Sequence, residues 1–141
     1  NFKKYKKIVM LGNFRPIVEK MKKLDIKVDI FDLRDKEISL PINEQKKYLQ
    51  QCDAAIVSAT SVYNLTFSEI ANNCNGEIFI LGPSSTMNDY FFDFNNVKGI
   101  FGSVFNNNDS KVLEIIKNNL GTRHFLKLGK KKVLIDSLKN S

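Results

Sequence analysis

Hydroxyl and amide side chains gather after two apolar segments of the sequence, where buried strands are expected to end. They are Ser58, Thr60 and Asn64 after the first segment and Gly82, Pro83, Ser84 and Ser85 after the second. Hydroxyls, together with the backbone N–H groups at a helix start, bind phosphate or carboxylate well. The sequence therefore predicts a site that accepts an anionic group. The alternative roles are capping of the next helix by Ser84 or Ser85 and bracing of a neighbouring loop by Asn64.

A third loop, Gly12-Asn13-Phe14, follows the first apolar run, and Asp32 follows the next strand-like run. Asp32 stands twenty residues after Gly12, where a dinucleotide-binding fold places the carboxylate that binds ribose. The segment LGNFRP has one glycine where that fingerprint has three, and Phe14 and Pro16 would crowd a pyrophosphate. We therefore expect Asp32 to meet a hydroxyl or a cation of a ligand without pyrophosphate, a nucleoside being one alternative.

Other catalytic and metal-binding patterns are missing from the sequence. His124 is the single histidine, and no P-loop, G-x-S-x-G or C-x-x-C occurs. Cys52 and Cys74 lack zinc-finger spacing, and we expect both to be reduced, with Cys74 in the core. The sequence therefore shows no motif for a metal site, and a metal cofactor has no assigned ligand set. The carboxylates available for a hard metal ion are Asp32, Asp89 and Asp93.

Short apolar runs alternate with segments of helical period along the whole chain. Strands are predicted at 6–11, 26–31, 54–59, 77–81, 97–102 and 131–135, and helices at 16–24, 42–52, from 66 and from 109. Strands that are apolar on both faces and alternate with helices indicate a parallel sheet covered on two sides. We therefore predict one α/β domain over 1–141, a three-layer Rossmann-like fold with a mainly parallel sheet. In such folds ligands bind beyond the carboxyl ends of the strands, which selects the loops at 12–14, 32–34, 58–64, 82–86 and 102–105.

Two helix starts carry specific signals. Thr66 and Glu69 have the spacing of a capping box, and Leu65 and Ile70 that of a hydrophobic staple. The helix that begins at Asp109 or Ser110 is expected to end at Gly121. Its predicted buried face consists of Val112, Leu113, Ile116 and Leu120.

Composition narrows the function classes. The chain has 141 residues and a net charge of +7, but its lysines are scattered, so a nucleic-acid partner is not expected. No apolar run is long enough to span a membrane and no export signal is visible, so we expect a cytoplasmic protein. The first residue is Asn, which suggests a fragment or a trimmed chain. The aromatic segment YFFDF at 90–94 suits either core packing or a dimer or domain interface.

Several stretches resemble one known family. They are MLGNFRPIVEKMK, IFDLR, CDAAIVSATSVYNLTFSEIA, IFILGPSSTM and GIFGSVFNNNDSKVLEII. In these stretches the chain is similar to the heavy-metal chelation domain family of bacterial and archaeal proteins. The resemblance implies a Rossmann-like C-terminal domain that follows a domain similar to the enolase N-terminal domain, with a pocket between the two. The chain departs from the family pattern at Ala59, at Leu65 and in the loop after Ser84.

Together these observations predict a domain that binds a small molecule or a metal complex, with heavy-metal chelation as the function that the resemblance implies. An enzyme that acts on a nucleoside-like or cofactor-precursor substrate, with Asp32 as general base, is the alternative. A nucleic-acid-binding module is the third hypothesis. Expected partners are the ligand itself, an N-terminal enolase-like domain or second subunit, and a second copy in a homodimer.

Overall fold

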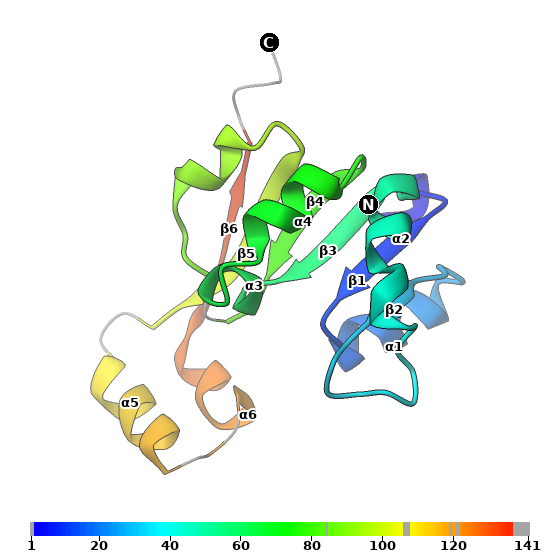
Figure 1. Ribbon diagram of the computed structural model, residues 1–141. Coiled ribbons are helices and arrows are strands. Elements are labelled where there is room, and N and C mark those ends of the chain that lie inside the picture. Colours follow the sequence, from blue (N-terminus) through cyan, green and yellow to red (C-terminus); the bar gives the residue numbers. More distant parts are fainter. Residues whose placement is uncertain (1, 84, 106–107, 119, 121, 137–141) are drawn as a thin grey trace.

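A six-stranded sheet forms the centre of the computed structural model, which describes residues 2–83, 85–105, 108–118, 120 and 122–136 (Figure 1). Its strand order is β2-β1-β3-β4-β5-β6. The first five strands are parallel, and β6 runs antiparallel beside β5. The predicted α/β class with a mainly parallel sheet is confirmed.

The strands are short and strongly apolar. They are β1 Ile8–Leu11, β2 Asp29–Phe31, β3 Ala54–Ser58, β4 Glu77–Leu81, β5 Val97–Val104 and β6 Lys130–Ile135. All residues of β1 and Ala54 to Val57 of β3 are buried, as expected for central strands covered on both faces. The order 2-1-3-4-5 is doubly wound, and the direction of winding reverses between β1 and β3.

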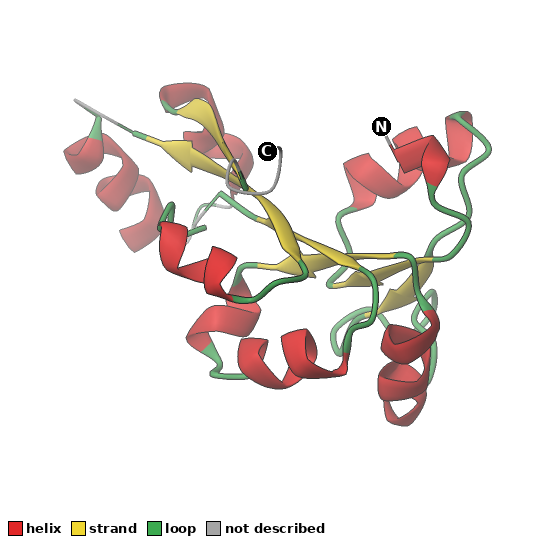
Figure 2. Ribbon diagram, turned by 90° about the horizontal axis from the view of Figure 1, so that it is seen from above, coloured by secondary structure: helices red, strands yellow, loops and turns green. Residues whose placement is uncertain are grey.

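Short helices connect the strands. They are α1 Arg15–Lys23, α2 Gln45–Gln51, α3 Thr60–Tyr63, α4 Phe67–Asn73, α5 Asp109–Lys117 and α6 Thr122–Phe125, with 3-10 helices at Phe2–Lys4, Ile42–Glu44, Asp89–Asp93 and Leu126–Leu128. Helices α2 and α4 lie on one face of the sheet and α1 lies on the other (Figure 2). In the described part of the chain, no helix combines the length and the apolar character needed to cross a bilayer.

Each face of the sheet has its own core. On the first face, Leu49 of α2 and Phe67 and Ile70 of α4 pack with alternate residues of the strands, among them Val9 and Val57. On the second face, Met21 of α1 packs with Ile8, Met10, Ile30 and Ile56. Alternation along each strand divides the side chains between the two cores. Full burial of one such side chain contributes about 1.5–3 kcal/mol.

The second face is covered only in part. The rings of Phe79 and Phe101 continue this face across β4 and β5, with Phe2 against Phe79 at 5.1 Å between centroids. On β6, Leu134 packs into the first core, so Val133 and Ile135 point to the second face. Their side chains remain 47% and 66% exposed. The β5–β6 half of this face is therefore an apolar surface largely open to solvent.

The start of α4 differs from the prediction in its hydrogen bonds. The helix begins after Thr66, as the sequence indicates, but Thr66 makes no side-chain cap and its hydroxyl donates to the Ser61 carbonyl at 3.2 Å. Thr66 has helical rather than extended dihedral angles, so its side chain points back toward α3. Leu65 is 89% exposed with a positive φ of 57°, and the predicted staple with Ile70 does not form.

The predicted burial of α5 is wrong for most of its apolar face. Val112 is buried, whereas Leu113, Ile116 and Leu120 are exposed. Helix α5 lies beside α6 at the end of the molecule and not over the sheet (Figure 1). The apolar side of α5 therefore does not pack on the sheet. The expected stop at Gly121 lies outside the described residues.

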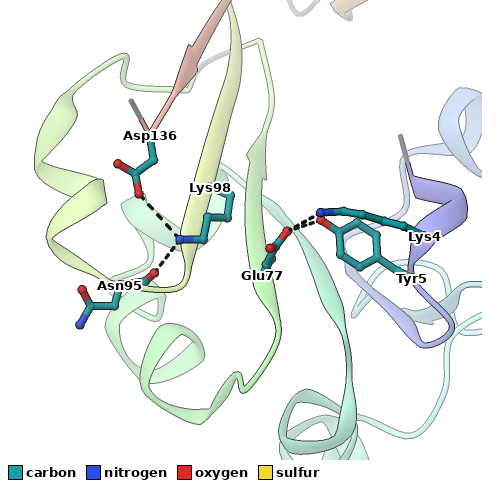
Figure 3. Close-up of polar contacts among 6 residues, drawn as sticks. All are labelled: Lys4, Tyr5, Glu77, Asn95, Lys98 and Asp136. Atoms are coloured by element: carbon teal, nitrogen blue, oxygen red, sulfur yellow. Dashed lines mark hydrogen bonds and ion pairs between the residues drawn. The ribbon is translucent and has the colours of Figure 1, made fainter. Parts of the chain in front are cut away.

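Polar contacts hold the amino-terminal edge of the sheet (Figure 3). Lys98 of β5 donates to the Asn95 carbonyl at 3.0 Å and lies 3.7 Å from the buried carboxylate of Asp136. The Tyr5 hydroxyl donates to the Glu77 carboxylate at the start of β4. This hydrogen bond is the main cause that lowers the pKa of Glu77 below its ordinary value.

We expect Tyr5→Phe to lower the free energy of unfolding by about 1 kcal/mol at neutral pH, because Glu77 loses the Tyr5 donor and keeps only the longer contact with Lys4 at 3.4 Å. The pKa of Glu77 is lowered in the folded state, so this contribution is present above the unfolded pKa of about 4.3 and is lost as the pH falls through the folded value. Denaturant titrations from pH 3 to 7 should therefore show the two proteins converging in acid. The control is Tyr90→Phe, at an exposed ring. If the difference in free energy of unfolding between the wild-type and Tyr5→Phe proteins did not change with pH, the role of Tyr5 as donor to Glu77 would be contradicted.

Candidate functional site

A cavity of about 850 Å³ lies where the winding reverses, at the carboxyl ends of β1 and β3. Its walls come from the loops after β1, β2, β3 and β4 and from the facing sides of α2 and α4. Doubly wound sheets bind ligands at this place because the loops of neighbouring strands diverge there. The topology and the cavity thus select the same position independently.

Most of the predicted site residues line this cavity. They are Gly12, Asn13, Phe14, Asp32, Ser58, Thr60, Asn64, Gly82 and Pro83. Ser85 is not on the wall: it is buried, and its hydroxyl donates to the Phe101 carbonyl at 3.0 Å. Ser84 lies outside the described residues. Residues 102–104, predicted as a loop, instead continue β5 and pair with β6.

Glycines allow the loops to meet closely beneath the cavity. Gly12 has a φ of +98°, and a Cβ at this position would lie 3.0 Å from the Cβ of Ser58. A Cβ on Gly82 would lie 3.0 Å from the Cβ of Ala59. Both glycines therefore press their loops against the end of β3, which sets the spacing of the polar groups above them.

The hydroxyls after β3 form a connected group. Ser58 Oγ and Thr60 Oγ1 are 2.9 Å apart, and the Ser61 hydroxyl donates to the Ser58 carbonyl at 2.8 Å. A hydroxyl can donate one hydrogen bond and accept two. Ser58 and Thr60 therefore keep hydrogen-bonding capacity toward the cavity after satisfying each other.

Asp32 braces the loops around it. Its Oδ2 accepts from the backbone N–H of Asn13 at 2.6 Å and its Oδ1 accepts from that of Arg34 at 2.7 Å. Its own N–H donates to Ser39 Oγ at 2.7 Å. Both carboxylate oxygens thus already hold backbone groups, and the residue orients the loops after β1 and β2.

Asn13 lines the cavity and has one buried acceptor without a partner among the described residues. Its Nδ2 donates to Asp35 Oδ2 at 2.9 Å, and Arg15 donates to the same oxygen at 2.9 Å. The hydrogen bonds from Arg15 and then Asn13 lower the pKa of Asp35. Among the described residues, Asn13 Oδ1 is buried and has no hydrogen-bond partner. A ligand donor would satisfy this oxygen.

The side walls were not predicted from the sequence. Gln45, Lys46 and Leu49 line the cavity from α2, and Glu69, Ile70 and Asn73 line it from α4. The spacing of four between Glu69 and Asn73 puts them on one helix face, which is a signal for a shared surface. That signal does not say which face of α4 turns toward the cavity.

This arrangement defines a class: a doubly wound α/β domain with a polar cavity at its topological switch point. The sequence matches the family DUF364, described as "Putative heavy-metal chelation", over residues 1–135. The chain belongs to this family, which confirms the resemblance. The preceding enolase-like domain remains a prediction. Comparison with curated proteins gives no match.

Two solved structures share the fold. One is a protein of unknown function from the DUF364 family of Desulfitobacterium hafniense, with 18% identity and a TM-score of 0.79 over 92% of this chain. The other is a protein of unknown function from the same family of Pyrococcus horikoshii, with 22% identity and a TM-score of 0.79 over 93% of this chain. The chain covers 52% and 55% of those chains, so it spans about half their length.

The cavity does not fit a bare heavy-metal ion. Its donors are hydroxyl, amide, carboxylate and backbone groups, and neither cysteine is on its wall. Within the described ranges, no group of three or more His, Cys, Asp or Glu residues is placed to hold a metal. Soft metals prefer thiolate and imidazole ligands. A metal held by an organic chelator would need only polar contacts to that chelator, which these groups can make.

Proposed function

We propose that this domain binds a small anionic molecule or an anionic metal complex in the cavity at the β1–β3 switch point. The observation that carries the proposal is the cavity of about 850 Å³ lined by polar groups of three loops. This volume lies in the usual range for small-molecule sites. The family description supports the metal-complex form of the ligand.

Each part of the wall has a role in this proposal. Ser58 and Thr60 share one hydrogen bond, so one of their two hydroxyls donates to an anionic group, and Asn64 orients that group from the wall. Arg34 and Lys46, both exposed and on the wall, add positive charge. The buried Asn13 Oδ1 accepts from a ligand hydroxyl or amide. A chelate with carboxylate and hydroxyl groups suits this combination.

Binding is favoured over catalysis because of Asp32. A general base must be positioned to reach the proton that it takes from the substrate. The two oxygens of Asp32 accept backbone N–H groups at 2.6 and 2.7 Å, which hold the carboxylate against the loops after β1 and β2. We therefore assign Asp32 to loop positioning.

The rest of a longer protein would add to this site. The matched structures are about twice as long as this chain. The open apolar half of the second sheet face, with Val133 and Ile135, would suit a contact with another domain. We propose that a domain partner, whether preceding or on a second chain, covers this face.

The test is isothermal titration with citrate, inorganic phosphate, Ni²⁺–citrate and Ni²⁺ alone. We expect citrate or its nickel complex to bind. Asn64→Asp should weaken that binding about tenfold, or about 1.4 kcal/mol, because it adds a like charge at the mouth. The matched control is Asn72→Asp on the exposed side of α4, away from the wall, which should leave affinity unchanged. Absence of binding by every anionic probe at millimolar concentration, or equal effects of the two substitutions, would contradict an anion-accepting cavity.

A further inference from the structure

The two cysteines meet at the sheet edge opposite the cavity. Cys52 is the C-cap of α2, two residues before β3, and Cys74 is the C-cap of α4, three residues before β4. Their sulfurs are 3.6 Å apart, and both thiols are free. The residues are 6% and 5% exposed. Residues 22 positions apart thus form one buried dithiol.

The sulfur spacing matches one kind of chemistry better than others. Two thiolates on adjacent corners of a tetrahedral site with metal–sulfur bonds of about 2.3 Å are about 3.8 Å apart. A disulfide requires about 2.05 Å, and linear coordination between two thiolates requires roughly 4.6 Å. The observed distance of 3.6 Å between the sulfurs is close to the first of these three values, so the two thiolates could bind a tetrahedral ion with almost no movement.

Charge balance also favours a divalent ion. Each thiol releases its proton when its sulfur binds a metal ion. Two thiolates and one divalent ion have no net charge, so the complex avoids the cost of burying a charge.

We infer that Cys52 and Cys74 form a dithiolate site for a thiophilic divalent metal ion of the Cd²⁺ or Zn²⁺ class. Backbone carbonyls lie beside the sulfurs, that of Leu49 at 3.3 Å from Cys52 Sγ and that of Gly76 at 3.5 Å from Cys74 Sγ. No third His, Cys, Asp or Glu joins the pair among the residues that the structure describes. Carbonyl oxygen or water therefore completes the shell, and the ion can exchange, unlike one in a closed structural site.

Access to the pair is through the helix ends. Both sulfurs sit where α2 and α4 finish, and helix ends open at low free-energy cost. Uptake is therefore expected to be slow but to reach equilibrium without global unfolding.

The experiment uses the full chain, fully reduced, dialysed to equilibrium against Cd²⁺. We expect one ion per chain, an ultraviolet thiolate-to-metal charge-transfer band, release of thiol protons, and affinity that increases with pH. Cys52→Ser and Cys74→Ser should each lower affinity by about 100-fold or more. Either variant could be poorly folded. In parallel, the experiment therefore measures whether bound Cd²⁺ protects the wild-type thiols from an alkylating reagent.

The outcomes separate this site from the cavity. Asn64→Asp should keep Cd²⁺ binding unchanged, and the serine variants should keep the citrate affinity of the wild-type chain. Reduced wild-type chain that shows no charge-transfer band and no thiol protection overturns the inference. A chain that instead oxidises readily to an intramolecular disulfide while taking up no Cd²⁺ overturns it as well and identifies a redox pair.

Discussion

Replacing Phe67 by alanine is expected to lower the free energy of unfolding by about 4 kcal/mol, the largest effect of any side-chain truncation proposed here. Phe67 begins α4 and is buried in the first core. Its ring meets Phe91 at 5.3 Å and Phe94 at 5.4 Å between centroids, nearly perpendicular to both. Truncation leaves a cavity and removes two edge-to-face contacts, each worth about 0.5–1.5 kcal/mol beyond burial.

The control is Tyr90→Ala in the same aromatic segment. Tyr90 is exposed, so its truncation should change stability by no more than about 0.5 kcal/mol. Guanidinium denaturation of the three proteins gives the comparison. Equal losses in the two variants would mean that α4 and the 89–93 segment do not share a core. The structure thus supports core packing for Phe91 of the YFFDF segment, whereas an interface role for Tyr90 stays a prediction.

Gly76→Ala should cost about 3 kcal/mol, although it adds one carbon. The new Cβ would lie 2.5 Å from the Asp53 backbone carbon and 2.6 Å from the Cys52 carbonyl oxygen. Backbone atoms cannot move aside as a flexible side chain does. The hydrogen bond from Glu77 N to Asp53 O, 2.9 Å long, would have to lengthen, and with it the start of the β3–β4 pairing.

Gly102→Ala provides the matched comparison. A Cβ there would meet Met87 Sδ at 3.0 Å, the movable end of a long side chain, and Ser85 Cβ at 3.2 Å. No backbone atom lies closer to it than 3.4 Å, so we expect a smaller loss of about 1 kcal/mol. Urea denaturation distinguishes the two cases. A Gly76 variant as stable as the Gly102 variant would show that the Asp53 backbone can give way.

The sequence alone determined the class of fold and most of the cavity loops. Apolar runs such as 54–57 are periodic on a scale of a few residues, so they identify strands without knowledge of their neighbours. Parallel strands place all their carboxyl ends on one edge, and that rule selected Gly12, Asp32, Ser58 and Gly82 together. The start of α4 could also be predicted from neighbouring residues alone, since the helix begins directly after Thr66, as the sequence indicates.

Roles that depend on contacts between distant residues were decided only by the tertiary structure. Asp32 is a brace because Asn13 and Arg34 present their N–H groups to it, and Ser85 turns to Phe101 and away from the cavity. The amphipathic face of α5 stays exposed because that helix lies beside α6, which no periodicity reveals. The dithiol has the same origin: Cys52 and Cys74 lack any motif spacing, and only the side-by-side packing of β3 with β4 brings their sulfurs to 3.6 Å. Local pattern fixes which segments form, whereas long-range packing fixes which side chains meet.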